Sequence, residues 1–481
     1  MANELPNILW ICTDQQRYDT VHCLNNPHIN TPVVDRLCAE GVAFSRAYCQ
    51  SPVCQPSRAS FLTGLYPNTI HVNRNGNAYF PANERVRLIT RRLADTGYDC
   101  GLAGKLHIAS CWTGTEPRVD DGYRVFDLST SALQFVGRGN AYTDWLTRIG
   151  RLDEAIDTSG IDPARNSGAR YRPDIPPELH QTAWCADRAI EFMEQERGGP
   201  WLMSVNIFDP HGPFDAPRSY QQRYLDKDLP PAIYGDRDAD TQERLRGAFF
   251  QQYSGPPGDK QRRQKASYYG MVELIDEQVA RMLDALERTG QRDNTVVIFM
   301  SDHGEMLGDH GLTAKGCRFY EGAVRVPLIV SWPGRFRQGV VADGLVELTD
   351  VAPTLAELAG EPLPWTNGRS LLPILAGNAD PAHHRDHVRC EYYDALNMYL
   401  PQEPGRHTPC WATMYRDDRH KLVTYHGLGH GELYDLQSDP QEVNNLWDDP
   451  AAATLRADLT QQSFDATIAA CDPGPAQIGR F

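Results

Sequence analysis

The sequence predicts an α/β protein with a large mixed sheet, helices on both faces of that sheet, and a smaller α+β domain with an antiparallel sheet at the C-terminus. Three observations lead to this prediction. Apolar runs alternate with helical segments, several runs end in polar side chains, and the pattern changes after about residue 377. Alternating strands and helices are typical of a largely parallel or mixed sheet. Because 481 residues exceed one compact core, we expect a main domain over residues 1–377 and a second over residues 378–481.

Apolar runs in the main domain have the length and composition of buried strands. They span residues 7–13, 98–103, 201–208, 295–301 and 326–331. Some of them lead directly into polar side chains, which are Asp14, the Asp209-Pro210-His211 segment and the Asp302-His303 pair. Ligands of such sheets bind outside the carboxyl ends of the strands. These side chains from distant parts of the sequence are therefore expected to meet in one crevice.

Capping residues and apolar periodicity predict the helices. The expected helices span residues 31–40, 57–65 and 265–289. Thr31 is the expected N-cap of the first helix, Pro32 takes its first position, and Gly41 is expected to stop it. The second helix starts just after Cys54, and the third has apolar residues at a helical period and stops at Gly290.

Two long segments and the C-terminal part complete the predicted organisation. Residues 137–177 and 209–263 are rich in Gly, Pro, Arg and Asp, and we expect them to run over the sheet edge and shape a substrate mouth. In the C-terminal part, residues 432–446 are expected to form a strand, a turn and the start of a helix. Further short antiparallel strands are expected at residues 387–393, 410–416 and 420–426.

Composition excludes some classes of protein. The formal net charge of −16 argues against a nucleic-acid surface, which needs clustered Lys and Arg. No run approaches the roughly 18 apolar residues of a membrane span, and the N-terminus lacks the pattern of a signal peptide. We therefore expect a cytoplasmic protein whose 12 cysteines are mostly reduced. None forms a CxxC zinc pattern, and Cys12 and Cys100 lie in apolar runs as small core residues.

The segment CQPSRASFLTG, which begins at Cys54, is the most specific signal in the chain. It resembles the signature of the formylglycine-dependent sulfatases of the alkaline phosphatase superfamily, and the resemblance extends over nearly the whole chain. A lone cysteine would be interpreted as an ordinary buried thiol. Pro56, Arg58 and the Leu62-Thr63-Gly64 triplet, all in register with Cys54, favour the sulfatase interpretation. The resemblance makes residues 1–377 the catalytic domain.

The resemblance implies that a maturation enzyme oxidises Cys54 to formylglycine. The hydrate of this aldehyde has two hydroxyls on one carbon. One attacks sulfur and displaces the alcohol, which gives a covalent sulfo-enzyme. The second then loses its proton, the carbon–oxygen bond to sulfate breaks, and water never has to attack the intermediate. Arg58, one helical turn after Cys54, is expected to hydrogen-bond the hydrate and neutralise charge.

The resemblance also implies one divalent metal ion between Asp14, Asp302, His303 and modified Cys54. Many sulfatases have a second Asp where this chain has Gln15, and Asn where it has His303. These two substitutions look like the phosphonate monoester hydrolase branch of the superfamily, and Gln15 is a further candidate ligand. Imidazole suits Mn²⁺ better than Ca²⁺, which prefers oxygen ligands, so we expect Mn²⁺ or Ca²⁺.

Cationic and imidazole groups are expected around the transferred anion. Lys105 and His107 lie in a segment similar to the G-K-x-H element of sulfatases, which the phosphonate hydrolases lack, so here the chain sides with the sulfatases. The resemblance implies that Lys105 bridges hydrate and sulfate and that His107 bonds the hydrate. His211 is expected to be the general acid at the leaving group. Lys315 is expected to bind sulfate, and Asn75 to add a hydrogen bond.

These observations predict an arylsulfatase-like hydrolase of small sulfate esters. The main alternative is a phosphonate monoester or phosphodiester hydrolase that uses the same site, and some cross-reactivity is expected because both substrates present one negative charge. A binding protein with unmodified Cys54 is the non-enzymatic alternative. The expected partners are a small anionic ester and the maturation enzyme, with no nucleic acid or membrane, and we expect a homo-oligomer.

Overall fold

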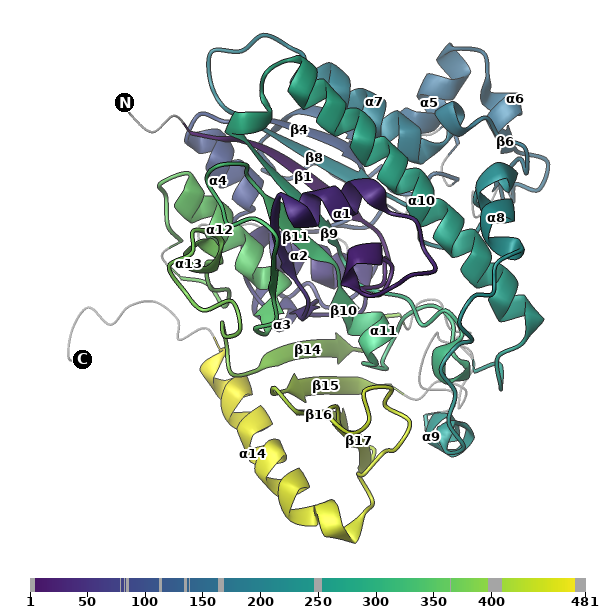
Figure 1. Cartoon of the computed structure of the whole chain (residues 1–481), viewed down its shortest axis with the longest axis vertical. Coiled ribbons are helices and arrows are strands. Elements are labelled where there is room, and N and C mark those ends of the chain that lie inside the picture. The colour runs from purple at the N-terminus through teal and green to yellow at the C-terminus, as the bar shows by residue number, and fades with distance from the viewer. Residues whose placement is uncertain are drawn as a thin grey trace.

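The structure is a computed structural model that describes residues 5–77, 79–81, 83, 86–111, 115–133, 136–137, 139–162, 168–245, 253–363, 365–396 and 409–471. An eight-stranded mixed sheet forms its centre, in the order β12-β2-β11-β9-β1-β8-β4-β5 (Figure 1). The strands are β1 (Asn7–Thr13), β2 (Gly41–Phe44), β4 (Asp99–Gly104), β5 (Tyr123–Leu128), β8 (Trp201–Ile207), β9 (Thr295–Ser301), β11 (Leu328–Ser331) and β12 (Val340–Ala342). The predicted α/β fold class is confirmed.

Strand β1 lies near the middle of the sheet and is parallel to both of its neighbours, β8 and β9. Strand β4 is parallel to β8 as well, whereas β11 is antiparallel to β9 and β2. The carboxyl ends of the parallel strands therefore meet at one edge, where Thr13, Ile207 and Ser301 are the last residues of β1, β8 and β9. This edge carries the side chains that the sequence singled out.

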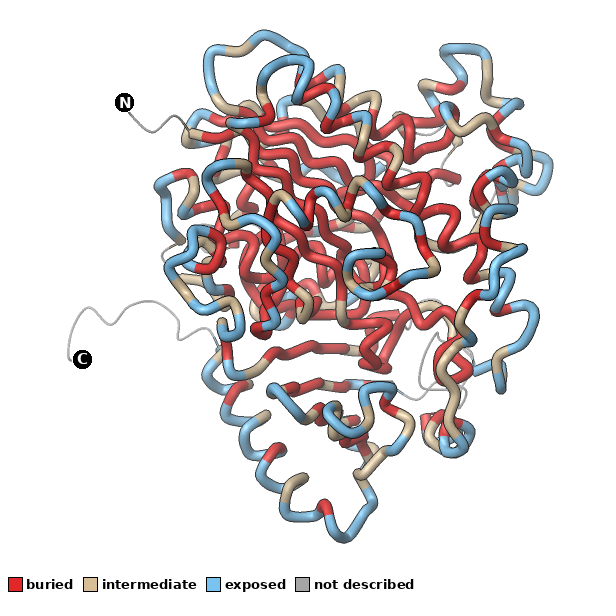
Figure 2. Tube along the Cα trace, viewed as in Figure 1, coloured by how far each residue is buried: buried red, intermediate tan, exposed pale blue. Residues whose placement is uncertain are grey.

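Side chains of β1 alternate between the two faces of the sheet. Ile8, Trp10 and Cys12 belong to one buried cluster, and Leu9 and Ile11 belong to the other. The first cluster is covered by α2 (Cys54–Thr63), α4 (Ile89–Asp95) and α12 (Val351–Leu358). The second is covered by α1 (Pro32–Ala39), α7 (Gln181–Met193) and α10 (Asp259–Arg288). The sheet is accordingly buried between two layers of helices, and the exposed residues lie toward the outside of the molecule (Figure 2).

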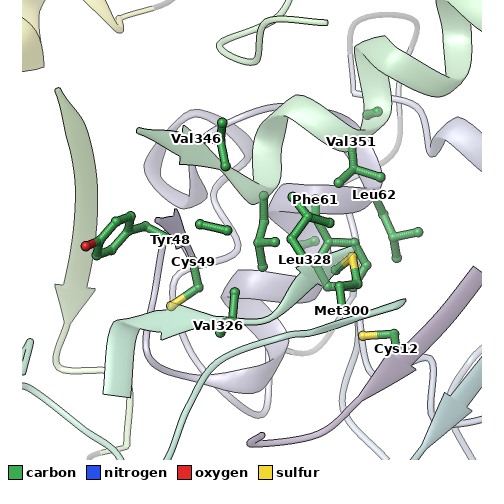
Figure 3. Close-up of a cluster of buried hydrophobic side chains, with 14 of the residues drawn as sticks. Cys12, Tyr48, Cys49, Phe61, Leu62, Met300, Val326, Leu328, Val346 and Val351 are labelled. Atoms are coloured by element: carbon green, nitrogen blue, oxygen red, sulfur yellow. The ribbon is translucent and has the colours of Figure 1, made fainter. Parts of the chain in front are cut away.

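Figure 3 shows part of the first cluster, in which Phe61 and Leu62 of α2 lie close to Met300 of β9 and Cys12 of β1. The apolar side of α2 is therefore fixed against the sheet over its last turns. Because Cys54 is the first residue of the same helix, this packing also sets where the predicted nucleophile lies.

Several predicted boundaries are wrong in detail. Helix α2 begins at Cys54 itself and ends at Thr63, and α10 begins six residues before the expected start, at Asp259. Helix α1 ends at Ala39, and Gly41 opens β2 instead of stopping the helix. A Cβ on Gly41 would lie 2.3 Å from the carbonyl oxygen of Val330. The close approach of β2 and β11 therefore explains why this position holds a glycine.

The N-cap of α1 also differs from the prediction. The hydroxyl of Thr31 accepts a hydrogen bond from the backbone N–H of His22 and does not cap the helix. The carboxylate of Asp276 on α10 accepts the N–H groups of Val33 and Val34 instead. A tertiary contact has thus taken the place of a local cap, which no local sequence pattern indicates.

The run at residues 326–331 is broken by Pro327, because proline has no N–H to donate to a sheet. Residues before it form β10 (Arg325–Val326), which pairs with β3 (Ala47–Tyr48) in a separate sheet completed by β13 (Val346–Glu347). Residues after it form β11 of the main sheet.

The two long excursions contain short elements. Residues 137–177 include α5 (Ala141–Arg148), α6 (Leu152–Ala155), β6 (Ile156–Asp157) and β7 (Arg170–Tyr171), and residues 209–263 include α8 (Arg218–Leu225) and α9 (Asp238–Glu243). Their segments 163–167 and 246–252 lie outside the described residues. The remaining short helices are η1 (His22–Leu24), α3 (Pro67–Ile70), η2 (Pro177–Leu179), η3 (Arg292–Asn294), η4 (Asp309–Gly311), α11 (Glu321–Val324), η5 (Leu348–Asp350) and α13 (Leu372–Leu375).

The C-terminal part forms an antiparallel sheet in the order β14-β15-β16-β17, as predicted. Its strands are β14 (Val388–Tyr393), β15 (Trp411–Arg416), β16 (His420–His426) and β17 (His430–Asp435), followed by η7 (Pro450–Ala452) and α14 (Ala453–Ala469). Helix α14, yellow in Figure 1, lies beside this sheet. The helix starts after the expected segment, because the carboxylate of Asp439 holds residues 443 and 444 in a turn.

All 12 cysteines are free thiols, and Cys12 and Cys100 are buried as expected of core residues. Within the described part of the chain, no helix combines the length and apolar character needed to cross a membrane.

Candidate active site

The carboxyl edge of the sheet brings the predicted strand-end residues together. Asp14 follows β1, Asp302 and His303 follow β9, and His211 lies four residues after the end of β8. Backbone hydrogen bonds extend the strand pairing past the strand ends, because the N–H of Asp14 donates to Asp209 and the N–H of Asp302 donates to Thr13, both at 3.2 Å. The backbones that carry these side chains are therefore held in register with each other.

Four side chains form a candidate metal site at this edge. Each of Asp14, Cys54, Asp302 and His303 offers one ligand atom, and these atoms lie within 4.8 Å of one another. The Sγ of Cys54 lies 3.1 Å from Nε2 of His303 and 3.7 Å from Oδ1 of Asp14. All four side chains are buried. Two carboxylates, one imidazole and one residue at position 54 are a donor set that fits a divalent cation.

His303 is oriented for this role by its backbone contact. Its Nδ1 lies 2.9 Å from the carbonyl oxygen of Gly304, which requires a proton on Nδ1 and directs Nε2 toward Cys54. Burial opposes a charge on the ring, but Asp302 and Cys54 outweigh it and raise the pKa of His303 to about 9. A proton and a divalent cation therefore compete for the same Nε2 lone pair.

The positive charge of Arg58 offsets the negative charges of the carboxylates of Asp14 and Asp302. Arg58 is fully buried, its Nε donates to Oδ2 of Asp302 at 2.8 Å, and its Nη2 lies 3.3 Å from Oδ2 of Asp14. Its third group, Nη1, donates to the carbonyl oxygen of Lys105 at 2.8 Å. Arg58 is thus a fixed part of the charge network and ties the Lys105 segment to α2.

Cys54 lies at the N-terminus of α2, where the first backbone N–H groups have no acceptor in the preceding turn of the helix, and where the helix dipole favours a negative charge. One of these groups, the N–H of Gln55, donates to Oδ1 of Asn75 at 3.0 Å, so Asn75 is a cap supplied by a distant loop. This contact orients the amide of Asn75, because its oxygen is the acceptor and its nitrogen is then directed elsewhere.

Positive charge surrounds Cys54. Burial opposes ionisation of its thiol, but Lys105, Lys315 and His303 hold the pKa of Cys54 well below its usual range. The ammonium of Lys105 donates to Asp14. The side chain of His107 hydrogen-bonds Cys54, and burial together with Lys105 lowers the pKa of His107 to about 4. The imidazole of His107 is therefore neutral and can exchange a proton with the group at position 54.

A second series of contacts links His211 to Gln15, at the same edge of the sheet as the candidate metal site. The ammonium of Lys315 contacts Nε2 of His211 and donates to Oε1 of Gln15. The amide nitrogen of Gln15 donates in turn to the carboxylate of Glu305. Ammonium groups only donate and carboxylates only accept, so these neighbours fix the orientation of the Gln15 amide. Its oxygen faces Lys315, and one lone pair of that oxygen is used there.

The structure therefore brings together all of the side chains that the sequence singled out at this edge. They are Asp14, Gln15, Cys54, Arg58, Asn75, Lys105, His107, His211, Asp302, His303 and Lys315. Sequence reasoning missed Glu305, Glu116 and Asn206, whose amide donates to the carbonyl oxygen of Lys105 at 2.8 Å. Glu305 lies two residues after a predicted ligand, which was a usable signal, whereas Glu116 and Asn206 match no pattern.

Comparison with known proteins assigns the chain to one family. The family model described as Sulfatase matches residues 6–361, and the model for the C-terminal part of N-sulphoglucosamine sulphohydrolase matches residues 308–468. The multifunctional alkaline phosphatase superfamily protein PehA of Trinickia caryophylli is 30% identical, with 97% of this chain and 96% of that protein covered. An arylsulfatase of Clostridium perfringens is 29% identical, with 92% and 90% covered.

Among solved structures, the phosphonate monoester hydrolase of Silicibacter pomeroyi is similar over nearly its full length. The TM-score is 0.80 at 27% identity, with 97% of this chain and 96% of that chain covered. Relatives named as sulfatases and as phosphonate monoester hydrolases thus share this fold.

Proposed function

This chain belongs to the sulfatase family of hydrolases, and we propose that it hydrolyses small sulfate monoesters with residue 54 as the nucleophile, after oxidation of Cys54 to formylglycine. One observation carries the proposal. Cys54 lies at a helix N-terminus within reach of two carboxylates and one imidazole, and lysines hold its pKa low. Such a site stabilises an anion that is bound at residue 54.

We further propose that Asp14, Asp302, His303 and residue 54 hold one divalent cation, Ca²⁺ or Mn²⁺, with Gln15 as an additional oxygen ligand. The cation would act as a Lewis acid on the bound anion, and formylglycine would supply a hydrated aldehyde with a nucleophilic hydroxyl. The buried donor set supports this assignment. The contact of Gln15 with Lys315 leaves only one lone pair of its oxygen for a cation.

The other side chains of the site have roles that follow from their contacts. Lys105 and Lys315 would balance the negative charge on the ester oxygens, which increases in the transition state. His107, which is neutral and touches residue 54, can accept a proton from the hydroxyl at that position. His211, in contact with Lys315, would protonate the oxygen of the leaving alcohol. The amide nitrogen of Asn75 would bind an ester oxygen.

A second candidate activity is hydrolysis of phosphonate monoesters or phosphodiesters. Gln15 and His303 favour it, as does the similarity to phosphonate monoester hydrolases. Lys105 and His107 favour sulfate esters as the substrate, because they lie in a segment similar to the G-K-x-H element of sulfatases. The test is to measure kcat/KM for an aryl sulfate and an aryl phosphonate monoester with the same phenol. We expect the higher kcat/KM for the sulfate, and a higher value for the phosphonate would assign the second activity instead.

The mass of the peptide that contains residue 54 tests the modification itself. Conversion of the thiol to the aldehyde lowers this mass by roughly 18 Da, because a CH₂–SH group becomes CH=O. The protein should be purified from its native host, since a host without the maturation enzyme would give a false negative. A fully unmodified peptide would favour a binding protein over a hydrolase.

Replacement of the nucleophile gives a further test. Cys54→Ala should reduce kcat by about 10³-fold or more, as removal of a nucleophile does in other enzymes, while the thermal unfolding midpoint stays close to that of wild type. Cys12→Ala is a suitable control, because Cys12 is equally buried but lies within β1. Turnover by Cys54→Ala at the wild-type rate would refute the proposed nucleophile.

A further inference from the structure

Glu116 makes contacts that the proposed chemistry does not use. Its carboxylate accepts backbone N–H groups from three consecutive residues: His107 at 2.6 Å, Ile108 at 2.6 Å and Ala109 at 2.9 Å. The side chain is 3% exposed. Three successive N–H groups that converge on one anion form a nest, in which the backbone folds around a negative charge.

The nest requires an uncommon backbone conformation at His107. Its φ is +56°, in the left-handed region that costs a residue with a Cβ about 1–2 kcal/mol. The carboxylate of Glu116 offsets this cost by pairing the N–H groups that the conformation turns inward. Without an anion, three N–H groups would point at each other with no acceptor, and His107 would return to ordinary backbone angles.

Both ends of the same loop are attached to α2. Arg58 donates to the carbonyl oxygen of Lys105, and the amide nitrogen of Gln55 donates to that of Ile108 at 2.9 Å. The carbonyl groups of the loop are thus held by the helix that begins at Cys54, and its N–H groups are held by Glu116. His107, between the two, has its side chain hydrogen-bonded to Cys54.

The charge on Glu116 matters for this geometry. A carboxylate offers lone pairs to all three N–H groups, whereas a carboxylic acid places a proton on one of the two oxygens. Burial raises the pKa of Glu116 to about 7, and the three N–H groups and the more distant Arg58 oppose that rise. The thiol of Cys111 also faces this carboxylate, with its Sγ 3.9 Å from Oε2. The carboxylate of Glu116 is therefore expected to gain its proton near pH 7.

We propose that Glu116 is a positioning residue, whose carboxylate holds the loop of residues 107–109 so that His107 stays in contact with residue 54. Glu116 does not touch the reacting atoms and acts only through the loop. The kinetic part of this proposal depends on the proposed sulfatase activity, and the structural part does not.

Glu116→Gln tests the proposal, because the amide replaces one acceptor oxygen by an N–H₂ group that opposes a backbone N–H. We expect kcat to fall by about 10–100-fold, as for a catalytic group misplaced by about 1 Å, with KM changed less than threefold. In wild type, kcat/KM should fall as the pH drops below about 7, where the carboxylate gains a proton. In Glu116→Gln this fall should be absent.

Hydrogen exchange of the backbone amides gives a readout without turnover. The peptide that covers residues 105–111 should exchange faster in Glu116→Gln than in wild type. In wild type its protection should decrease below pH 7, after correction for the intrinsic pH dependence of exchange. If wild type hydrolyses no sulfate ester, the proposed activity fails and this measurement alone decides the role of Glu116. Should Glu116→Gln not fold, Glu116→Asp, which keeps the charge on a shorter side chain, should show weaker protection with the same pH dependence.

Asp276 provides a matched control. It is buried, accepts two backbone N–H groups at the start of α1, and burial raises its pKa to about 7 as well. Asp276→Asn should lower the unfolding midpoint and leave the pH dependence of kcat/KM unchanged. Three results for Glu116→Gln would each overturn the proposal. They are a kcat equal to that of wild type, a fall of kcat/KM below pH 7 as in wild type, and hydrogen exchange of residues 105–111 at the wild-type rate. The same change of pH profile in Asp276→Asn would also overturn it, because the effect would then be one of general stability.

Discussion

At the scale of single residues, His211 and Lys315 share one contact that bears on the proposed protonation of the leaving group. The Nδ1 of His211 lies 2.7 Å from the carbonyl oxygen of Gly212, so Nδ1 carries a proton and Nε2 faces Lys315. Because an ammonium only donates, Nε2 is the acceptor in this contact, and a proton that His211 gives to the departing oxygen would reach Nε2 from Lys315. The two side chains act as a pair whose members can be separated by mutation.

His211→Ala should reduce kcat for sulfate esters of weakly acidic phenols by about 10²–10⁴-fold, the usual range for a general acid, and should affect strongly acidic phenols much less. The measurement is the dependence of kcat/KM on the pKa of the leaving phenol, compared between wild type and variant. Equal losses across the series would remove His211 from the role of acid. Lys315→Ala is the companion variant, and it should raise KM for all esters because it removes a positive charge.

Glu305 should matter through Gln15, whose amide nitrogen donates to the carboxylate of Glu305. Glu305→Gln would let either end of the neighbouring amide face Lys315, since an amide side chain both donates and accepts. We expect kcat/KM to fall by roughly 10-fold, which corresponds to about 1.4 kcal/mol, the scale of one lost hydrogen bond. Glu154→Gln, at an exposed carboxylate, is the control and should keep the wild-type value. An unchanged kcat/KM in Glu305→Gln would show that Gln15 needs no such support.

These residues also show which parts of the candidate site can be predicted from the sequence. Asp14, Asp302 and His211 were predictable, because apolar strands that end in polar residues must place them at one sheet edge. Glu305 and Gln15 are 290 residues apart, and Glu116 binds a loop through backbone groups, whose identity is the same at every position. The position of Glu305, two residues after His303, could have drawn attention to it, but its partner Gln15 and the loop bound by Glu116 could not be identified from a single sequence.

At the scale of elements, the end of β4 depends on a glycine. Gly104 has φ +103°, and a Cβ there would lie 1.9 Å from the carbonyl oxygen of Asn206 on β8. The absence of a side chain lets the two strands approach, and Lys105 follows directly. Substitution of this glycine and of a second glycine with a similar φ can therefore separate the free-energy cost of backbone strain from the cost of steric overlap.

Gly104→Ala should destabilise the protein by about 2–5 kcal/mol, the sum of positive-φ strain and overpacking, and should displace Lys105 enough to abolish turnover. Gly97→Ala is a matched control, because Gly97 has φ +100° with no atom within 4 Å of a built Cβ. It should cost only about 1–2 kcal/mol, the strain alone. Free energies of unfolding from urea titrations give both numbers, and equal costs would rule out the overlap with β8.

Boundaries of elements were less predictable than their existence. The strands and helices of the main domain are present, yet α1 is capped by Asp276 of another helix and Gly41 serves strand packing, not a helix stop. Local patterns such as N-caps and stop glycines have tertiary substitutes, and these shift the ends of elements by several residues.

At the scale of the whole molecule, Lys421 joins the C-terminal sheet to the rest. It is fully buried on β16, donates to the carbonyl oxygen of Phe319, and forms ion pairs of 2.7 Å with both Glu321 and Glu442. The match of one family model to residues 308–468 likewise spans the predicted boundary at residue 377. We infer that the proposed domains 1–377 and 378–481 depend on each other for stability.

Lys421→Met should destabilise the protein by about 3–5 kcal/mol, because it leaves buried carboxylates without their cation. Arg419→Met, two residues earlier, removes an exposed partner of Asp435 and should cost less than about 1 kcal/mol. Urea titrations of both variants test the difference. A fragment of residues 1–377 should fail to unfold cooperatively, and a stable, cooperative fragment would contradict the inferred dependence.

The burial of α2 has a consequence for the order of events in the life of this protein. Every residue of Cys54–Thr63 is buried, and the helix packs against the sheet and its neighbours. We propose that an enzyme that oxidises Cys54 acts on this segment before the helix is buried. The proposed oxidation would then precede folding, and a chain that folds with the Cys54 thiol intact would stay inactive.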